Sequence, residues 1–185
     1  MIHTPRAARQ LCALVLIVTT AACSGPAKAR EGGPLSNSDE SMKVCLPLAA
    51  GQSDAAWGVE VLANTGSEVL TLTGVSPIDP QGLRVSEAVI VSIAEKDDLF
   101  GAWSRWPPRS ADQSPGAARW SGRRPVVGHQ IKPGKQASEN LVAHVVRDPS
   151  VSEATMRALR IDYTVGDQSY WIETNTSLAL KPKCS

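Results

Sequence analysis

Residues 159–180, LRIDYTVGDQSYWIETNTSLAL, decide the fold of this chain. From Leu159 to Val165 apolar residues alternate with polar ones, which is the two-residue period of a strand with one buried face. Gly166-Asp167 then supplies a turn, and residues 169–180 are again rich in aromatic, β-branched and aliphatic side chains. The stretch therefore predicts a β-hairpin whose return strand runs to Leu180.

Similar strand patterns precede this hairpin, and turn residues such as Asn64-Thr65-Gly66-Ser67 and Pro133-Gly134 separate them. The segments with strand character are 57–62, 68–75, 83–93, 126–131 and 140–147. Helical periodicity is nearly absent. About seven or eight short strands, with turns every ~8–12 residues, are typical of an all-β sandwich or barrel, and we expect a single sandwich.

The N-terminus has the three parts of a secretory signal peptide. Arg6 and Arg9 give a positive start, an apolar run follows over residues 11–20, and small residues then occupy the cleavage site. This run is too short to cross a bilayer core of about 30 Å as a helix. We expect residues 1–22 to be removed from the mature protein.

The sequence Thr20-Ala21-Ala22-Cys23 resembles the lipobox of bacterial lipoproteins, a family that prefers leucine where Thr20 stands. The resemblance implies that Cys23 is acylated and becomes the first residue of the mature chain. Because more than one acyl chain holds a protein stably on a membrane, it also implies an extracytoplasmic envelope protein, at an outer membrane or a Gram-positive plasma membrane. The alternative is an ordinary signal peptide cleaved near Ala22, which leaves Cys23 as a free thiol.

Residues 23–41 predict a flexible tether, because they contain glycine, proline, serine and asparagine with almost nothing to bury. If Cys23 carries lipid, Cys45 and Cys184 remain as the only possible pair, since Cys12 leaves with the signal peptide. The lipobox resemblance thus implies a disulfide between the two ends of a domain of residues 42–185. It would close a loop of about 140 residues and contribute about 5 kcal/mol in the chain-entropy model.

Residues 42–185 have the size of one domain with a single core. Loss of the signal peptide lowers the basic count from 19 to 17, against 18 acidic residues, so the overall charge selects no class of partner. The hairpin predicted over residues 59–75 resembles the early hairpin of secreted bacterial immunoglobulin-like domains. This resemblance implies an immunoglobulin-like sandwich and carries no activity with it.

Residues 94–125 interrupt the strand pattern and contain three of the five tryptophans. A loop of this length in a compact domain is uncommon and is usually functional or disordered. Between residues 105 and 135 the basic residues outnumber the single acidic one, which gives a local charge of about +6. We single out the following side chains as a candidate binding site: Trp103, Arg105, Trp106, Arg109, Arg119, Trp120, Arg123 and Arg124.

Two interpretations of this segment are open. Tryptophan and arginine are enriched in binding hot spots, so the segment can be a recognition loop for an envelope protein or for an anionic or carbohydrate polymer. Alternatively, the tryptophans fold back onto the sandwich, and the arginines stack on them or stay in solvent. Trp57 and Trp171 lie on predicted strands, and we expect both to pack in the core.

The sequence contains no recognisable motif for catalysis. His129 and His144, the only histidines left after removal of the signal peptide, have no histidine or cysteine at metal-ligand spacing. A Gly-x-Ser-x-Gly elbow and a glycine-rich phosphate loop are also missing. We predict no metal, no cofactor, no nucleic-acid partner and no enzyme. An enzyme would need a pocket in which His129 or His144 meets a serine or a carboxylate within hydrogen-bonding reach.

The sequence thus favours a membrane-anchored envelope lipoprotein with a non-catalytic binding or structural role through residues 94–125. The first alternative is an accessory subunit of an envelope assembly, which would contact its partners through an exposed β edge. A hydrolase without a recognisable motif is the third hypothesis. Neither the ligand nor the oligomeric state follows from the sequence.

Overall fold

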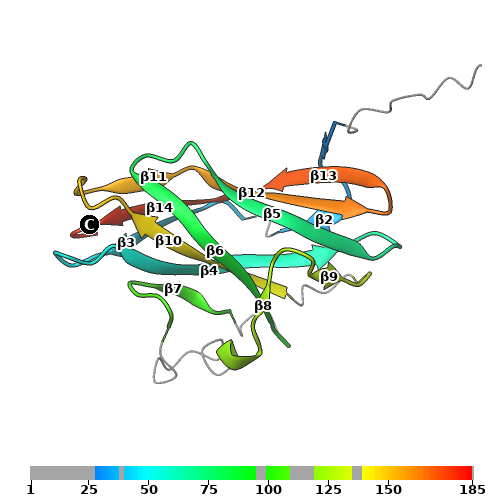
Figure 1. Ribbon diagram of the computed structural model, residues 1–185, viewed down its shortest axis with the longest axis horizontal. Coiled ribbons are helices and arrows are strands. Elements are labelled where there is room, and N and C mark those ends of the chain that lie inside the picture. Colours follow the sequence, from blue (N-terminus) through cyan, green and yellow to red (C-terminus); the bar gives the residue numbers. More distant parts are fainter. Residues whose placement is uncertain (1–27, 38–39, 95–98, 109–118, 135–138, 185) are drawn as a thin grey trace, which may run out of the picture.

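The computed structural model describes residues 28–37, 40–94, 99–108, 119–134 and 139–184. Within these ranges the chain forms β-strands and one 3₁₀ turn, η2 (Trp120–Gly122), and no helix is long and apolar enough to span a membrane (Figure 1). The strands are β1 (Arg30–Glu31), β2 (Leu35–Ser36), β3 (Met42–Pro47), β4 (Asp54–Asn64), β5 (Leu70–Ile78), β6 (Leu83–Ser92), β7 (Gly101–Trp103), β8 (Arg124–Pro125), β9 (Gln130–Ile131), β10 (Glu139–Arg147), β11 (Ala154–Met156), β12 (Ala158–Val165), β13 (Gln168–Glu173) and β14 (Thr176–Lys181).

The strands form a sandwich, which confirms the predicted all-β sandwich architecture (Figure 1). The hairpin predicted over residues 59–75 is wrong, because β4 pairs with β2, β7 and β10 whereas β5 pairs with β9 and β12 in a different sheet. One layer is a six-stranded sheet in the order β2-β4-β10-β6-β8. Its sixth strand, β7, pairs with residues 56–58 of β4, whereas β2 pairs with residues 63–64 of the same strand. Opposite it lie a five-stranded sheet, β1-β13-β12-β5-β9, and a three-stranded sheet, β11-β14-β3. The side of the six-stranded sheet that faces these two sheets is called the inner face below, and the other side the outer face.

The main core fills the space between the layers. Leu159, Ile161 and Tyr163, the alternating residues of β12, are fully buried in it, as the two-residue period predicted. Trp57 of β4 is also fully buried and belongs to this core, so its expected core position is confirmed. Trp171 is only partly buried on β13, and the guanidinium of Arg160 stacks 4.6 Å from its ring centre.

The C-terminal hairpin forms as predicted, but its return strand is shorter. Strands β12 and β13 pair antiparallel, and Val165 lies opposite Gln168. The backbone of Thr174 donates to Leu159 O, while its Oγ1 accepts from Leu159 N, so the hairpin closes there. Beyond it the chain changes sheet and becomes β14, which pairs with β3 and β11. The expectation of one strand through Leu180 was therefore wrong.

Residues 126–131 also differ from the expected strand. Only Gln130–Ile131 is extended, because His129 N donates to Val126 O across a tight turn. Gly128 has a φ of +84° in this turn, a conformation that favours glycine. The apolar residues Val126 and Val127 therefore occupy a turn; Val126 is buried and Val127 is 70% exposed.

The packed structure begins before Met42. Strand β1 pairs with β13 and β2 pairs with β4, although the sequence placed both in the tether. These residues pack on the sandwich because Leu35 is buried in the core and because Gly33 lets the backbone approach the side chain of Tyr163. The Tyr163 hydroxyl donates to Gly32 O, and a Cβ on Gly33 would collide with the same tyrosine.

A disulfide joins Cys45 and Cys184, as predicted. It links Cys45 in β3 to Cys184, which follows β14. Strands β3 and β14 run parallel and side by side in the three-stranded sheet. The bridge therefore ties together segments 139 residues apart. The signal peptide and Cys23 lie outside the described residues, so their roles stay predictions.

Candidate functional site

The outer face of the six-stranded sheet carries a second apolar cluster, separate from the main core. Strand β10 supplies both, because Leu141, Ala143 and Val145 face inward while Val142 faces outward. The cluster contains Ala56, Val89, Val91, Phe100 and Val142, with Trp103, Trp106 and Trp120 packed against it. Figure 1 shows β7 and η2 on this side of the sheet, away from β5 and β12. Part of the segment 94–125 thus forms a third layer, called the aromatic layer below.

Asn140 anchors the aromatic layer to the sheet. This side chain is fully buried, and its Oδ1 accepts a hydrogen bond of 2.8 Å from the backbone N–H of Phe100. Its Nδ2 donates to the carbonyls of Gly58 and Glu60, where β4 is irregularly paired with β10. A Cβ on Gly58 would lie 2.8 Å from the Phe100 ring, so the close approach of the two strands requires glycine.

The three tryptophans of this segment contact one another or the sheet. Trp106 and Trp120 meet edge to face, with ring centres 5.0 Å apart, and Trp120 lies 5.2 Å from the ring of Phe100. The indole N–H of Trp103 donates to Phe100 O. All three indoles are partly buried and keep some exposed surface. Such edge-to-face pairs contribute stability beyond their buried area.

Two of the predicted arginines lie against this layer or on the strand beside it. Arg123 lies 4.8 Å above the Trp120 ring and donates to Trp120 O, while Arg124 belongs to β8 beside β6. Arg105, Arg119, Arg123 and Arg124 are exposed. Arg109 lies outside the described residues. The structure therefore gathers the described members of the predicted set on one side of the molecule.

The packing of this segment agrees with the structural interpretation, and the binding interpretation stays a hypothesis. The tryptophans do fold back onto the sheet, and Arg123 does stack on Trp120, as the structural interpretation requires. The three indoles nevertheless stay partly exposed, and the arginines next to them in the sequence are exposed.

A hydrogen-bonded polar chain of three side chains lies beside the aromatic layer. The sequence singled out only one of them, His144, and did not identify the serine and the carboxylate that it meets. His144 of β10 has a hydrogen-bond partner at each ring nitrogen. Nδ1 lies 2.7 Å from Ser86 Oγ, and Nε2 lies 2.7 Å from Asp54 Oδ1. The Trp106 ring stacks on the imidazole, nearly parallel, with centres 4.7 Å apart. The hydrogen bonds from Ser53 and His144 hold the pKa of the Asp54 carboxyl below its ordinary value.

A β-bulge in β6 places Ser86 next to His144 in this hydrogen-bonded polar chain. His144 lies opposite Glu87 and Val145 lies opposite Val85, so Ser86 is the extra residue of β6. The sequence carries one trace of the bulge, which is the pair of consecutive polar residues Ser86-Glu87 inside an alternating strand. Nothing in the sequence indicates that three strands bring Ser86, His144 and Asp54 together.

The other titratable groups are placed differently. His129 Nε2 is 3.5 Å from a carboxylate oxygen of Glu139, beyond good hydrogen-bond distance. Glu60 points into the main core, and among the described residues neither of its oxygens has a hydrogen-bond partner. Burial raises the pKa of Glu60, and the side chains of Thr176, Thr174 and Asn37 oppose that shift. No group of three or more potential metal ligands occurs in the described part of the chain.

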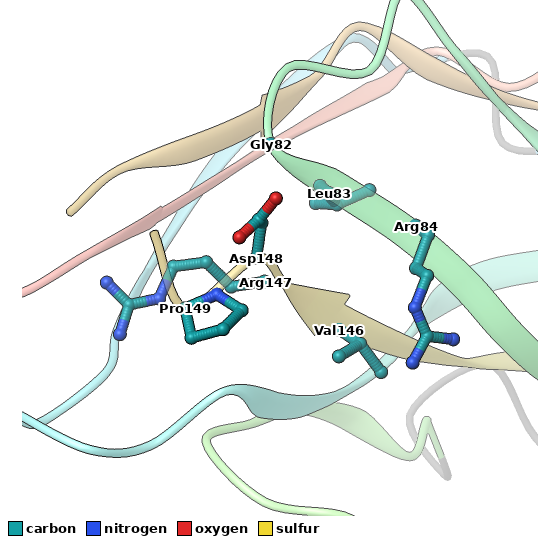
Figure 2. Close-up of a pocket in the computed structure, with 7 residues that line it drawn as sticks. All are labelled: Gly82, Leu83, Arg84, Val146, Arg147, Asp148 and Pro149. Carbon is teal, nitrogen blue, oxygen red and sulfur yellow. The ribbon is translucent and has the colours of Figure 1, made fainter. Parts of the chain in front are cut away.

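A cavity of about 470 Å³ opens where β6 begins and β10 ends (Figure 2). In Figure 2 the side chains of Arg84 and Val146 point to the same side, whereas the guanidinium of Arg147 points away from them. Arg147 is largely buried, and its guanidinium donates to the carbonyls of Gln52, Val151 and Ser152. Arg84 is therefore the exposed cation of this cavity.

Comparisons with known proteins add little to this geometry. No family model and no curated protein matches the chain. A solved structure, the ASH / PapD-like domain of human CEP192 (PapD-like domain 7), is similar at 7% identity and a TM-score of 0.37. The similarity covers 82% of this chain and 87% of that one. At this level we draw no functional argument from it.

Proposed function

We propose that the protein is an extracytoplasmic envelope lipoprotein, anchored through lipid on Cys23, with a binding role carried by the aromatic layer. The aromatic layer contacts an anionic, sugar-containing polymer of the envelope. The observation that carries the proposal is the position of three partly exposed indoles on the outer face, next to exposed arginines. Indoles offer flat apolar surfaces for sugar rings, and guanidinium groups pair with carboxylate or phosphate in a planar fork.

The disulfide and the sequence of the N-terminus support the envelope location. Structural disulfides are typical of oxidising compartments outside the cytoplasm. Residues 30–36 are fixed to the sandwich, which leaves only residues 23–29 as a spacer between the lipid and the packed domain. Fully extended, those seven residues span at most about 25 Å. The partner must therefore lie near the membrane surface.

The binding test uses the full-length lipoprotein in detergent micelles, sedimented with isolated cell-wall sacculi. We expect Arg123→Ala and Trp106→Ala each to weaken co-sedimentation about tenfold, the effect of losing one hot-spot contact. Arg160→Ala is the matched control, because Arg160 also stacks on a tryptophan but belongs to the five-stranded sheet. Failure of the wild-type protein to sediment, or an equal loss in the control, would contradict polymer binding.

The anchor has a separate test. Intact-mass measurement of the mature protein should show acyl chains on Cys23, and Cys23→Ala should move the protein from the membrane to the soluble fraction. Cys12→Ala is the control, since Cys12 is removed with the signal peptide. A mature protein with an unmodified Cys23 would show that the anchor is absent.

A second candidate function is that of an accessory subunit, and one observation favours it. In the described part of the chain, β3 pairs with β14 on one side only, and Met42 at its start is 45% exposed. An edge strand with free backbone groups can add a strand from a partner protein. The N–H of Lys43 points away from β14, so Lys43→Pro should abolish such an assembly and leave sedimentation with sacculi unchanged.

A further inference from the structure

The polar chain on the outer face has a defined proton arrangement. Asp54 is ionised, because its pKa is lowered, and a carboxylate can only accept. His144 Nε2 must therefore carry the hydrogen that bridges to Asp54 Oδ1. In the neutral ring Nδ1 then holds a lone pair, and it accepts the hydroxyl hydrogen of Ser86 over 2.7 Å.

This arrangement has the three parts of an activated nucleophile. Ser86 is exposed, so an electrophile can reach its Oγ. The imidazole is only 16% exposed and is covered on one face by Trp106, so little water competes for the hydrogen bond. Asp54 orients the ring and would balance the charge of an imidazolium.

We propose that Ser86 is a nucleophile activated by His144 and Asp54, and that this centre hydrolyses carboxylic esters. Ser86 Oγ forms a bond to the carbonyl carbon, and its proton passes to His144 Nδ1. The bond from that carbon to the alkoxy oxygen breaks, and the leaving alcohol takes the proton from His144. Water then attacks the acyl-serine by the same route, which releases a carboxylic acid and restores the hydroxyl of Ser86.

Arg84, which lies along β6 from this centre, suggests the class of ester. It also lines the cavity of Figure 2, whose lining includes the carboxylate of Asp148 and none of the residues Ser86, His144 and Asp54. Arg84 and Val146 lie opposite each other in the register, each two residues along its strand from Ser86 and His144. Two residues span about 7 Å of a strand, the length of a short acyl group. The charge of Arg84 already acts on Asp54. We therefore assign the site to esters whose acyl part ends in an anionic group that pairs with Arg84.

The direct test is reaction of the full-length lipoprotein, in detergent micelles, with a fluorophosphonate. Such a probe forms a bond from phosphorus to an activated serine oxygen and expels fluoride. Peptide mass spectrometry should find the adduct on Ser86, and Ser86→Ala should remove it. His144→Gln should slow labelling by a factor of about 100 or more, the usual contribution of a positioned base. Asp54→Asn should slow it at least about tenfold.

The same strand offers a matched control. Ser92 Oγ is exposed on β6 and bonds to Glu139 Oε2 without a histidine, so it should remain unlabelled. An unlabelled wild-type protein, equal labelling of Ser92, or an unchanged rate in His144→Gln would overturn the proposal. Thermal unfolding of each variant shows that it is folded, and Asp54→Asn replaces His144→Gln if the latter is not.

The substrate assignment has its own measurement. The protein should cleave 4-nitrophenyl hemisuccinate with a kcat/KM about tenfold above that for 4-nitrophenyl acetate, and Arg84→Gln should remove this difference, as expected when one charge pair is lost. Equal rates for the two esters in the wild-type protein would show that Arg84 does not select the acyl group. These outcomes are independent of sacculus binding, because Arg84 is not part of the aromatic layer.

Discussion

The two faces of the six-stranded sheet are closed in different ways. The inner face packs against regular strands, and its large side chains, such as Trp57 and Leu141, are fully buried. The outer face is covered by an irregular segment whose tryptophans remain partly exposed. One strand, β10, contributes to both. The comparison indicates that most of the large, fully buried side chains, which contribute most to stability, belong to the inner face.

Polar groups sharpen the contrast. On the outer face Asn140 has partners at both ends of its amide, and His144 has partners at both ring nitrogens. On the inner face Glu60 is buried near the side chains of Thr174 and Thr176, yet neither of its oxygens accepts a hydrogen bond of good geometry from the described residues. Satisfied polar networks specify a geometry, while an unpartnered buried carboxyl costs stability.

The largest effect is expected at the inner face. Trp57→Ala removes a fully buried indole and should lower the free energy of unfolding by about 3–5 kcal/mol. Chemical denaturation monitored by far-UV circular dichroism measures it. A loss below about 1 kcal/mol would mean that the core relaxes around the cavity, contrary to the tight packing of this face.

The second-largest loss of stability is expected at Asn140, the residue that bonds the aromatic layer to the six-stranded sheet. Asn140→Ala leaves the buried N–H of Phe100 without its acceptor, so we expect a loss of about 2–3 kcal/mol. The fluorescence of the layer tryptophans should shift toward that of exposed indole at low denaturant, before the sandwich unfolds. A single transition with all probes coincident would indicate that the aromatic layer does not detach independently.

Removal of one indole from the aromatic layer should cost less than either change. Trp106→Ala deletes a partly exposed ring that contacts Trp120 and His144, and a loss of about 1–2 kcal/mol is expected. Thermal unfolding of Trp106→Ala and Trp57→Ala under the same conditions compares the two losses of stability. Equal losses in the two variants would place Trp106 in the core and remove the basis of the binding proposal.

The smallest effect concerns Glu60 and depends on pH. The folded state binds the Glu60 proton more tightly than the unfolded state, so this group favours folding below the ordinary pKa of 4.5. Its contribution falls as pH rises through the higher folded-state pKa. Glu60→Gln should therefore stabilise the protein by about 1 kcal/mol at pH 8 and by less at pH 4. The same gain at both pH values would exclude titration of Glu60 as the cause.

Local patterns in the sequence predicted the inner face well. The alternation from Leu159 to Val165 identified a buried strand, and the lipobox resemblance led to the disulfide now seen between Cys45 and Cys184. The change of sheet at Thr174 was missed, because it depends on a hydrogen bond to a residue fifteen positions earlier and not on a turn motif.

The outer face was predicted only as a set of residue types. Composition singled out the tryptophans and arginines of residues 94–125, since their clustering is visible in one dimension. The chain of Asp54, Ser86 and His144 was not visible, because its members come from three strands and one of them depends on a bulge. The packing of residues 30–36 was also missed, because two-residue strands have no periodicity to detect.

Amide hydrogen exchange of the full-length lipoprotein in micelles tests most directly whether the outer face is a separable layer. The two amides to compare are those of Phe100, bonded to Asn140, and Leu159, bonded to Thr174 in the main core. Both are buried in the native structure, so differences report opening and not simple exposure. We predict that Phe100 exchanges about 10- to 100-fold faster, through an opening that leaves the sandwich folded. Identical exchange free energies for the two amides would show that the aromatic layer and the core open as one unit, and would contradict this account.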